Sequence, residues 1–246
     1  MRFQFPRLTP TVKKLLIFLG VSFVTVAIVE NVGGFPLFEL GALNVGFMEG
    51  NAWMLAWQPF TYWMVWPPQP AALIGFAITL LMIYFFLSAF EESFGAKRTL
   101  QLTGVGVLAG AAGCLALGAL LSVMGVSVQV FPPSGAGVVA AAAFGAFPVI
   151  FRGREILLFP LMIPLKAWTA LAIGIGISAL MAVLAKDPFV LAEQAAAIAA
   201  GVGFAKWITR PRTPSGASPK KKKKRRSGPD LRVVRGGDDE PPRYLN

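Results

Sequence analysis

Long apolar runs alternate with short polar segments along most of this chain. Six of the runs approach the roughly 20 residues that a helix needs to cross the hydrocarbon layer of a membrane. The predicted fold class is therefore an all-α polytopic membrane protein. The predicted spans cover residues 13–31, 71–90, 100–124, 134–151, 167–185 and 189–208.

A shorter apolar piece, ILLFPLMIPL at 156–165, interrupts the series between the fourth and fifth spans. Pro160 and Pro164 break it, because proline lacks a backbone donor and disrupts a helix interior. The piece is too short to cross a membrane alone. We expect a re-entrant or interfacial segment that leads into the fifth span.

Lysine and arginine fall on alternate loops between the runs. They precede the first span, separate the second from the third and the fourth from the fifth, and follow the sixth. The loops 32–70 and 125–133 contain none, and Lys186 is the one exception to the alternation. Basic residues mark cytoplasmic loops, so the pattern predicts six crossings of a plasma or inner membrane, with both termini in the cytoplasm.

The outer loop 32–70 is long and rich in tryptophan. Because tryptophan favours the headgroup layer, we expect this loop to lie against the outer leaflet. Glycine and alanine crowd the third to sixth spans, which favours close helix packing in one compact bundle. The loop's tryptophans are Trp53, Trp57, Trp63 and Trp66.

The composition supports a membrane protein and adds a basic tail. Hydrophobic residues make up 55% and charged residues 14% of the chain, whereas soluble domains have about 25% charged residues. More than half of the basic residues lie from Lys206 onward. We divide the chain into a short cytoplasmic N-terminus (1–12), a membrane domain (13–208) and a disordered cytoplasmic tail (209–246) rich in proline, glycine and serine.

A run of consecutive cations lies inside this tail. A cation near an anionic leaflet contributes about 1 kcal/mol, so we expect the run to bind anionic lipid headgroups. An acidic partner is the alternative, although the apolar remainder of the chain gives little reason to expect nucleic acid. The run comprises Lys220, Lys221, Lys222, Lys223, Lys224, Arg225 and Arg226.

The sequence indicates no cofactor or metal site. Its single cysteine, Cys114, lies in an apolar run and can form neither an intrachain disulfide nor a thiolate cage for zinc. The GxG pairs at 104–106, 174–176 and 201–203 lack the strand context of a nucleotide-binding loop.

Four segments between residues 53 and 207 resemble the motifs of a known family of membrane proteins. WQPFTYWMVW at 57–66 is similar to the lead-in to the second rhomboid span, and FEESFGAKRTLQL at 90–102 to the exit from it. PPSGAG at 132–137 resembles the serine turn, and LAEQAAAIAAGVG at 191–203 the last span. The resemblance to the rhomboid superfamily implies a six-helix rhomboid-like bundle with a long outer loop between spans one and two. The family's structural positions fall on Glu91, Gly95, Arg98, Gly135 and Gly203.

The family chemistry implied by the resemblance is peptide-bond cleavage within the membrane by a serine–histidine dyad. Ser134 matches the nucleophile, but the chain contains no histidine. A serine hydroxyl is a poor nucleophile until a neighbouring base takes its proton. The matching position for the catalytic histidine is Ala196, that for the oxyanion-stabilising asparagine is Thr79, and those for further histidines are Gly75 and Trp66.

Other features also argue against catalysis at Ser134. Pro132 replaces the first glycine of the serine turn and stiffens it. Lys166 is expected on the opposite side of the membrane, and Lys186, next to Asp187, is expected to be a solvated cation rather than a base. We therefore expect Ser134 to cap the helix that follows it.

Three glutamates lie in or beside apolar spans, where ionisable residues suggest function. Glu91 and Glu92 are close in sequence to Lys97 and Arg98, so we expect an ion pair or a role as acceptor of backbone N–H groups. Glu193 begins the last span, and we expect a carboxylate at the outer rim that water can reach.

These features favour a catalytically inactive rhomboid-like integral membrane protein, a pseudoprotease that binds single-span transmembrane clients or acts as a scaffold in the lipid bilayer. The alternative is an active intramembrane serine endopeptidase with Ser134 as nucleophile and an unrecognised base. A small transporter is disfavoured, because the spans lack paired polar residues at mid-depth.

Overall fold

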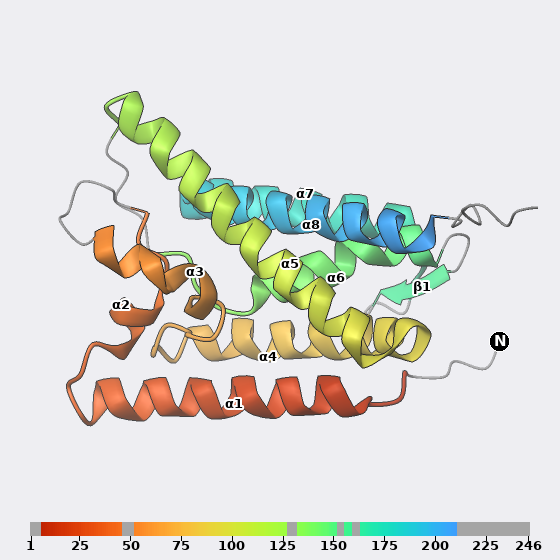
Figure 1. Ribbon diagram of the computed structural model, residues 1–246, viewed down its shortest axis with the longest axis horizontal. Helices are drawn as coiled ribbons and strands as arrows, with labels where there is room; N and C mark the ends of the chain where they lie inside the picture. The colour runs from red at the N-terminus through yellow and green to blue at the C-terminus, as the bar shows by residue number, and fades with distance from the viewer. Residues whose placement is uncertain (1–5, 46–51, 127–131, 152–154, 159–162, 211–246) are drawn as a thin grey trace, which may run out of the picture. The chain divides into compact units, whose positions relative to one another are not determined.

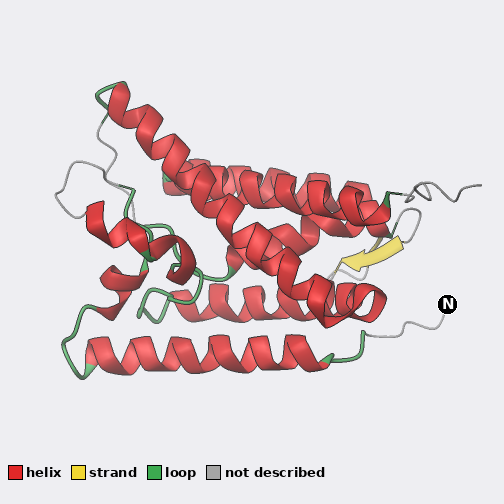
Figure 2. Ribbon diagram, viewed as in Figure 1, coloured by secondary structure: helices red, strands yellow, loops and turns green. Residues whose placement is uncertain are grey.

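The computed structural model describes residues 6–45, 52–126, 132–151, 155–158 and 163–210. Within these residues the chain is mostly helical, as expected (Figure 2). The run of cations at 220–226 and the rest of the chain beyond Arg210 lie outside the described residues.

Four helical stretches are long and apolar enough to cross a membrane, which is consistent with an integral membrane protein. They are α1 (Pro10–Asn31), a 52-residue stretch from Ala72 to Val123, most of α7 (Ala167–Ala185), and α8 (Pro188–Thr209). In Figure 1, α1, α7 and α8 run nearly parallel in the view, and α5 is inclined to them.

The 52-residue stretch contains the predicted second and third spans. It consists of α4 (Ala72–Met82), a π-helical turn η2 (Ile83–Leu87) and α5 (Ser88–Val123). Gly95 interrupts the helical backbone with a φ of 77° and a ψ of 168°. A left-handed φ is costly for residues with a Cβ, so glycine allows the chain to change direction between the two predicted spans.

The fourth predicted span is shorter than expected. Helix α6 covers Gly137–Ile150, which is 14 residues or about 21 Å of helix. It begins three residues later than predicted because Gly135, at a φ of 89°, turns the chain before the helix starts.

The apolar piece before the fifth span forms a short hairpin that the sequence did not indicate. Strand β1 (Glu155–Leu158) pairs antiparallel with β2 (Ile163–Lys166), and Leu157 is opposite Pro164. A proline is tolerated here because a two-stranded ladder has only edge strands.

The described part of the loop 32–70, which we call the outer loop after its predicted location, contains three short helical elements. These are α2 (Leu37–Gly41), the 3-10 helix η1 (Ala52–Ala56) and α3 (Gln58–Thr61). Gln58 is fully buried, and its side chain accepts a hydrogen bond from the Asn44 backbone and donates to the Glu39 carbonyl. The loop is therefore held by specific hydrogen bonds to its own backbone.

Small residues bring α5, α6 and α8 close together, in agreement with the sequence pattern. A Cβ atom added to Gly201 of α8 would lie 2.0 Å from the Ala142 carbonyl oxygen of α6. A Cβ on Gly106 of α5 would lie 2.4 Å from the Ala142 Cβ. These helices supply much of the main hydrophobic core, whereas no described residue of α7 belongs to it.

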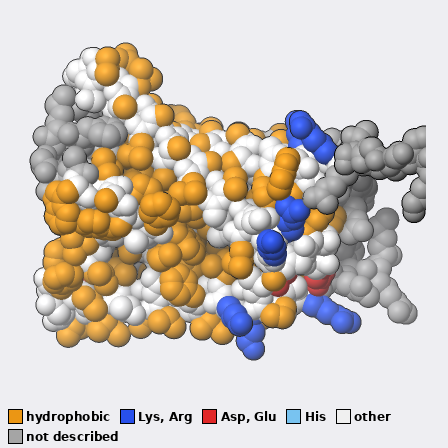
Figure 3. Space-filling model, in the orientation of Figure 1, with side chains coloured by type: hydrophobic (Ala, Val, Ile, Leu, Met, Phe, Trp, Pro, Cys, Tyr) orange, Lys and Arg blue, Asp and Glu red, His pale blue; other side chains and the backbone are white. Residues whose placement is uncertain are grey.

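Charged side chains are unevenly distributed over the described residues. On the face seen in Figure 3, lysine and arginine side chains gather at the end where α1 begins and α8 ends, and hydrophobic side chains cover most of the remainder. The opposite end carries the outer-loop helices α2 and α3.

Candidate functional site: the Ser134 pocket

The turn that carries Ser134 is hydrogen-bonded to the outer loop. The Pro133 carbonyl accepts a hydrogen bond from the Leu43 N–H (3.0 Å), and the Gly135 N–H donates to the Tyr62 carbonyl (2.9 Å). Tyr62 is fully buried, and its hydroxyl donates to the Val107 carbonyl of α5 (2.8 Å). The segment around Tyr62, part of the WQPFTYWMVW stretch at 57–66, therefore positions the serine turn.

The Trp66 ring lies directly on this turn. A Cβ atom added to Gly135 would lie 2.5 Å from two ring carbons of Trp66, so only glycine fits beneath the indole. Trp66 also packs edge-on against Phe76, with ring centroids 5.4 Å apart. A bulky ring therefore covers the backbone next to Ser134, and Trp66 is one of the positions where the family resemblance implies a histidine.

A pocket of about 320 Å³ includes Ser134 in its wall. Three segments form this wall: the chain entering α4, the serine turn, and the start of α8. We call it the Ser134 pocket. Its lining residues are Pro67, Gln69 and Ala72, then Pro132, Pro133 and Ser134, then Asp187, Val190 and Glu193.

Ser134 does not cap α6, so that prediction was wrong. The N-cap position is Ala136, and no side-chain cap bond is present. The left-handed Gly135 places Ser134 two residues before the cap, away from the free N–H groups of the first turn. The Ser134 hydroxyl is partly exposed and forms no hydrogen bond with the residues that the structure describes.

Glu193 is buried, so the prediction of a water-exposed rim carboxylate was also wrong. Its exposed fraction is 7%, and its Oε1 atom is buried without a hydrogen-bond partner among the described residues. The side chain lies against Gly110 of α5, where an added Cβ would be 3.3 Å from the Glu193 Cγ. Glu193 is thus an internal acid that also lines the Ser134 pocket.

Two hydrogen-bond donors close to Glu193 are used elsewhere. The Tyr62 oxygen would lie 2.8 Å from the same added Cβ on Gly110, yet its hydroxyl donates to Val107. The Cys114 thiol, one helical turn along α5, donates to the Phe189 carbonyl at 3.6 Å. Neither group satisfies the carboxylate.

The other acid of the pocket, Asp187, has a structural role. It is the N-cap of α8 and accepts a hydrogen bond from the Phe189 N–H (2.9 Å). The neighbouring Lys186 is exposed and adopts a left-handed conformation (φ 53°), as expected for a solvated turn residue. No ion pair joins a described lysine or arginine to Asp187 or Glu193.

The other positions matched to the family's catalytic groups do not line this pocket. Ala196 packs against α5, where its Cβ would lie 2.7 Å from a Cβ on Gly113. Thr79 lies on α4, partly exposed, and is not among the lining residues. From α8 the pocket receives Glu193 instead, a residue that the sequence marked only as an acid at the start of an apolar run.

The structural positions carried over from the family behave differently from one another. Gly135 and Gly95 both have positive φ values, which explains their identity. The Arg98 guanidinium lies over the Trp207 ring at 5.0 Å and so ties α5 to the end of α8. Gly203, in contrast, is exposed with no atom within 4 Å of an added Cβ, and Gly201 makes the close contact with α6.

Of the two roles expected for Glu91, an ion pair or a backbone acceptor, the structure shows the second. It accepts hydrogen bonds from the backbone N–H groups of Thr11 (3.2 Å) and Val12 (3.1 Å) and from the Thr9 hydroxyl. Glu92 similarly accepts from the Arg7 N–H (2.9 Å). The pair anchors the start of α1, where the free N–H groups and the helix dipole favour negative charge.

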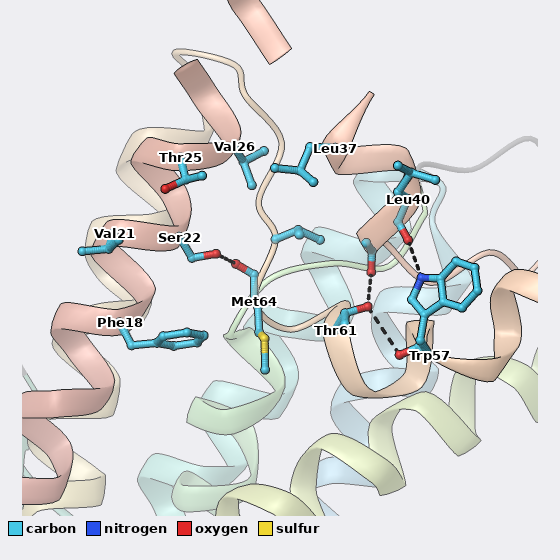
Figure 4. Close-up of a pocket in the computed structure, with 12 residues that line it drawn as sticks. Phe18, Val21, Ser22, Thr25, Val26, Leu37, Leu40, Trp57, Thr61 and Met64 are labelled. Atoms are coloured by element: carbon cyan, nitrogen blue, oxygen red, sulfur yellow. Dashed lines mark hydrogen bonds between the residues drawn. The ribbon is translucent and has the colours of Figure 1, made fainter. Parts of the chain in front are cut away.

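A larger, apolar pocket of about 440 Å³ lies between α1 and the outer-loop helices (Figure 4). Ser22 donates to the Met64 carbonyl (2.7 Å), Thr61 to the Gly41 carbonyl (3.1 Å) and the Trp57 indole to the Leu40 carbonyl (3.0 Å). None of the described residues that line this pocket has a titratable side chain, so they offer no acid–base chemistry.

The described residues contain no group of three histidine, cysteine, aspartate or glutamate side chains that could hold a metal ion. No protein-family model matches the sequence, and a comparison with curated proteins found no match. The chemistry of the Ser134 pocket is therefore argued from its own residues.

Proposed function

We propose that this chain is a catalytically silent, rhomboid-like integral membrane protein that binds transmembrane segments of other proteins. The observation that carries the proposal is the state of Ser134. Its hydroxyl lies in a pocket, yet it has no hydrogen-bonded base among the described residues, and the whole chain lacks histidine. Nucleophilic catalysis by serine depends on such a base.

The packing of Trp66 on the serine turn also argues against catalysis. Oxyanion stabilisation requires donors aimed at the place where negative charge develops. Here the Trp66 ring is packed on Gly135, and the Gly135 N–H already donates to Tyr62. The turn is built for a stable contact between the outer loop and α6.

Client binding is inferred from α7, which buries Ala167, Ala170, Leu171 and Ala182 but exposes larger apolar side chains such as Ile177 and Leu180. Of the four stretches long enough to cross a membrane, it is the one with no described residue in the main core. Gly174 of α7 packs closely against α6. A Cβ atom added to Gly174 would lie 2.5 Å from the Phe144 ring. Small residues allow close helix approach, so a transmembrane segment of another protein could pack beside α7.

Six crossings with both termini in the cytoplasm complete the proposal. The break at Gly95 supports counting the 52-residue stretch as two spans, and α6 would be a short span that enters at the serine turn. The gathering of basic side chains at one end supports a cytoplasmic location for that end. Reporter fusions after Asn31, Lys97, Gly125, Phe151, Lys186 and Arg210 test the topology, which predicts alternating outer and cytoplasmic positions.

Photocrosslinking tests client binding. A crosslinking amino acid at Ile177 of α7 is compared with one at Val24 of α1, since both side chains are 53% exposed. We expect crosslinks to single-span membrane proteins from Ile177 and few from Val24. Equal yields from both sites would contradict a client surface at α7.

Glu193 favours one second candidate, an active serine endopeptidase. Its unpaired carboxylate lines the same pocket as Ser134 and is a chemically possible base. The carboxylate would take the Ser134 proton as Oγ attacks a peptide carbonyl, and would then give that proton to the departing amine. Water would hydrolyse the acyl-enzyme.

Fluorophosphonate labelling of the purified protein separates the two candidates. The silent protein is expected to show no labelling at Ser134. Labelling that is lost in both Ser134→Ala and Glu193→Gln, together with cleavage of a transmembrane substrate, would establish the protease instead. Glu39→Gln serves as the control, because Glu39 is an exposed acid of the outer loop.

A further inference from the structure

We propose that the Ser134 pocket binds a primary ammonium group, held by the carboxylate of Glu193 with the Ser134 hydroxyl and the Gln69 amide oxygen as further acceptors. The ammonium could belong to a free amine or to a lysine side chain of a bound transmembrane segment. The free-amine case stands independently, and the lysine case rests on the client binding proposed above.

The first step is the unsatisfied carboxylate. Burial of an unpaired acid costs free energy, and ionisable groups inside membrane bundles normally pair with another group. Glu193 is only 7% exposed and accepts no hydrogen bond from the described residues, while the neighbouring donors of Tyr62 and Cys114 are bound to carbonyls. Glu193 also lines the Ser134 pocket, so its carboxylate can meet a partner that enters there.

The second step is the sign of the charge. Two carboxylates, Asp187 and Glu193, line the pocket, and no described lysine or arginine does so. The partial positive charge at the start of α8 is already capped by Asp187. Glu193 lies beyond the first turn of α8, where the effect of the helix dipole has largely faded. A cationic ligand is therefore favoured over an anionic one.

The third step is the set of acceptors in the pocket lining. An ammonium group has three donors and no acceptor. The pocket presents a carboxylate, a hydroxyl and an amide from three different segments, at Glu193, Ser134 and Gln69. A volume of about 320 Å³ is at the small end of organic-ligand sites, and its proline, alanine and valine walls suit a short alkyl stem.

Binding of butylammonium to the full chain in detergent micelles tests the proposal by calorimetric titration and thermal shift. We expect saturable binding to the wild type and a loss of affinity of about tenfold or more in Glu193→Gln, since the charged partner is removed from a buried pair. Ser134→Ala is expected to weaken binding by a smaller factor. Glu39→Gln, which removes an exposed acid outside the pocket, should bind as the wild type does.

Tetramethylammonium is the matched ligand control, because it carries the same charge without N–H donors. Equal binding of tetramethylammonium, unchanged binding in Glu193→Gln, or no binding of butylammonium would each overturn the proposal. The thermal-shift measurement also reports whether Glu193→Gln still folds, through its thermal transition.

A single-span peptide with one lysine at its outer end, compared with the same peptide carrying norleucine, identifies the source of the ammonium. Preference for the lysine peptide that disappears in Glu193→Gln supports a client side chain. Binding of butylammonium without any such preference supports a free amine. Labelling of Ser134 by a fluorophosphonate would contradict the silent scaffold while leaving the amine titration to be judged on its own result.

Discussion

Glu91 and Glu193 are two buried glutamates with opposite surroundings. Each is 7% exposed, and each lies in an apolar helix. Glu91 accepts from two backbone N–H groups and one hydroxyl at the start of α1, whereas Glu193 has no hydrogen-bond partner among the described residues. The contrast separates an acid that holds the fold together from an acid that is available to a ligand.

The largest effect is expected when the satisfied acid is removed. Glu91→Met keeps the approximate volume but leaves the Thr11 and Val12 N–H groups and the Thr9 hydroxyl without their acceptor. We expect the free energy of unfolding to fall by about 2 to 4 kcal/mol, because each hydrogen bond to a charged group is worth about 1.5 to 3 kcal/mol before relaxation. Thermal or denaturant unfolding in micelles measures it, and an unchanged midpoint would show that the start of α1 does not depend on Glu91.

Gly135 and Gly95 have positive φ values, and they extend the comparison from the two acids to two glycines. Gly135→Ala meets both a positive φ and the Trp66 ring, whereas Gly95→Ala meets only a positive φ. We expect a loss of about 2 to 3 kcal/mol for Gly135→Ala. For Gly95→Ala, whose φ of 77° and ψ of 168° lie in a region that is essentially restricted to glycine, we expect about 1 to 3 kcal/mol. Gly104→Ala is the control: it lies within α5 with no atom within 4 Å, so it should be neutral or slightly stabilising.

Replacement of Glu193 by methionine should change the free energy of unfolding in the opposite direction to Glu91→Met. Glu193→Met replaces a buried unpaired carboxylate by an apolar side chain of similar size. We expect the free energy of unfolding to rise by about 1 to 2 kcal/mol, since burial of an unpaired acid is unfavourable. Unfolding is again measured in micelles, in the absence of amines. A loss of stability would mean that Glu193 contributes to the fold as Glu91 does.

The positions of the long helices could be predicted from sequence, because an apolar run of sufficient length is local information. For Glu91 the sequence left two roles open, an ion pair or a backbone acceptor, because its donors at Thr9, Thr11 and Val12 lie about 80 residues earlier in the chain. The rotation of a helix about its axis is different, because packing sets it. In α8 the contact of Gly201 with Ala142 turns Glu193 toward Gly110, and hydropathy alone does not contain that contact.

The serine turn was misread for a similar reason. A serine before an apolar run resembles an N-cap, but the left-handed backbone of Gly135 shifts the cap to Ala136. That backbone depends on the Tyr62 carbonyl and the Trp66 ring, which come from a segment about 70 residues earlier in the chain. The hairpin at 155–166 was likewise missed, since two prolines in an apolar run indicate only that a helix is broken.

The smallest effects distinguish the Ser134 hydroxyl from the Asp187 carboxylate, which both line the Ser134 pocket. Asp187→Ala removes the N-cap bond to the Phe189 N–H and should lower the free energy of unfolding by about 1 kcal/mol. Ser134→Ala removes a hydroxyl that makes no hydrogen bond to a described residue, so we expect a change below about 0.5 kcal/mol. Unfolding of both variants beside the wild type measures the difference. A cost for Ser134→Ala as large as that for Asp187→Ala would mean that the hydroxyl stabilises the turn, and the serine would then belong with Glu91 among the structural groups rather than with Glu193 in the binding pocket.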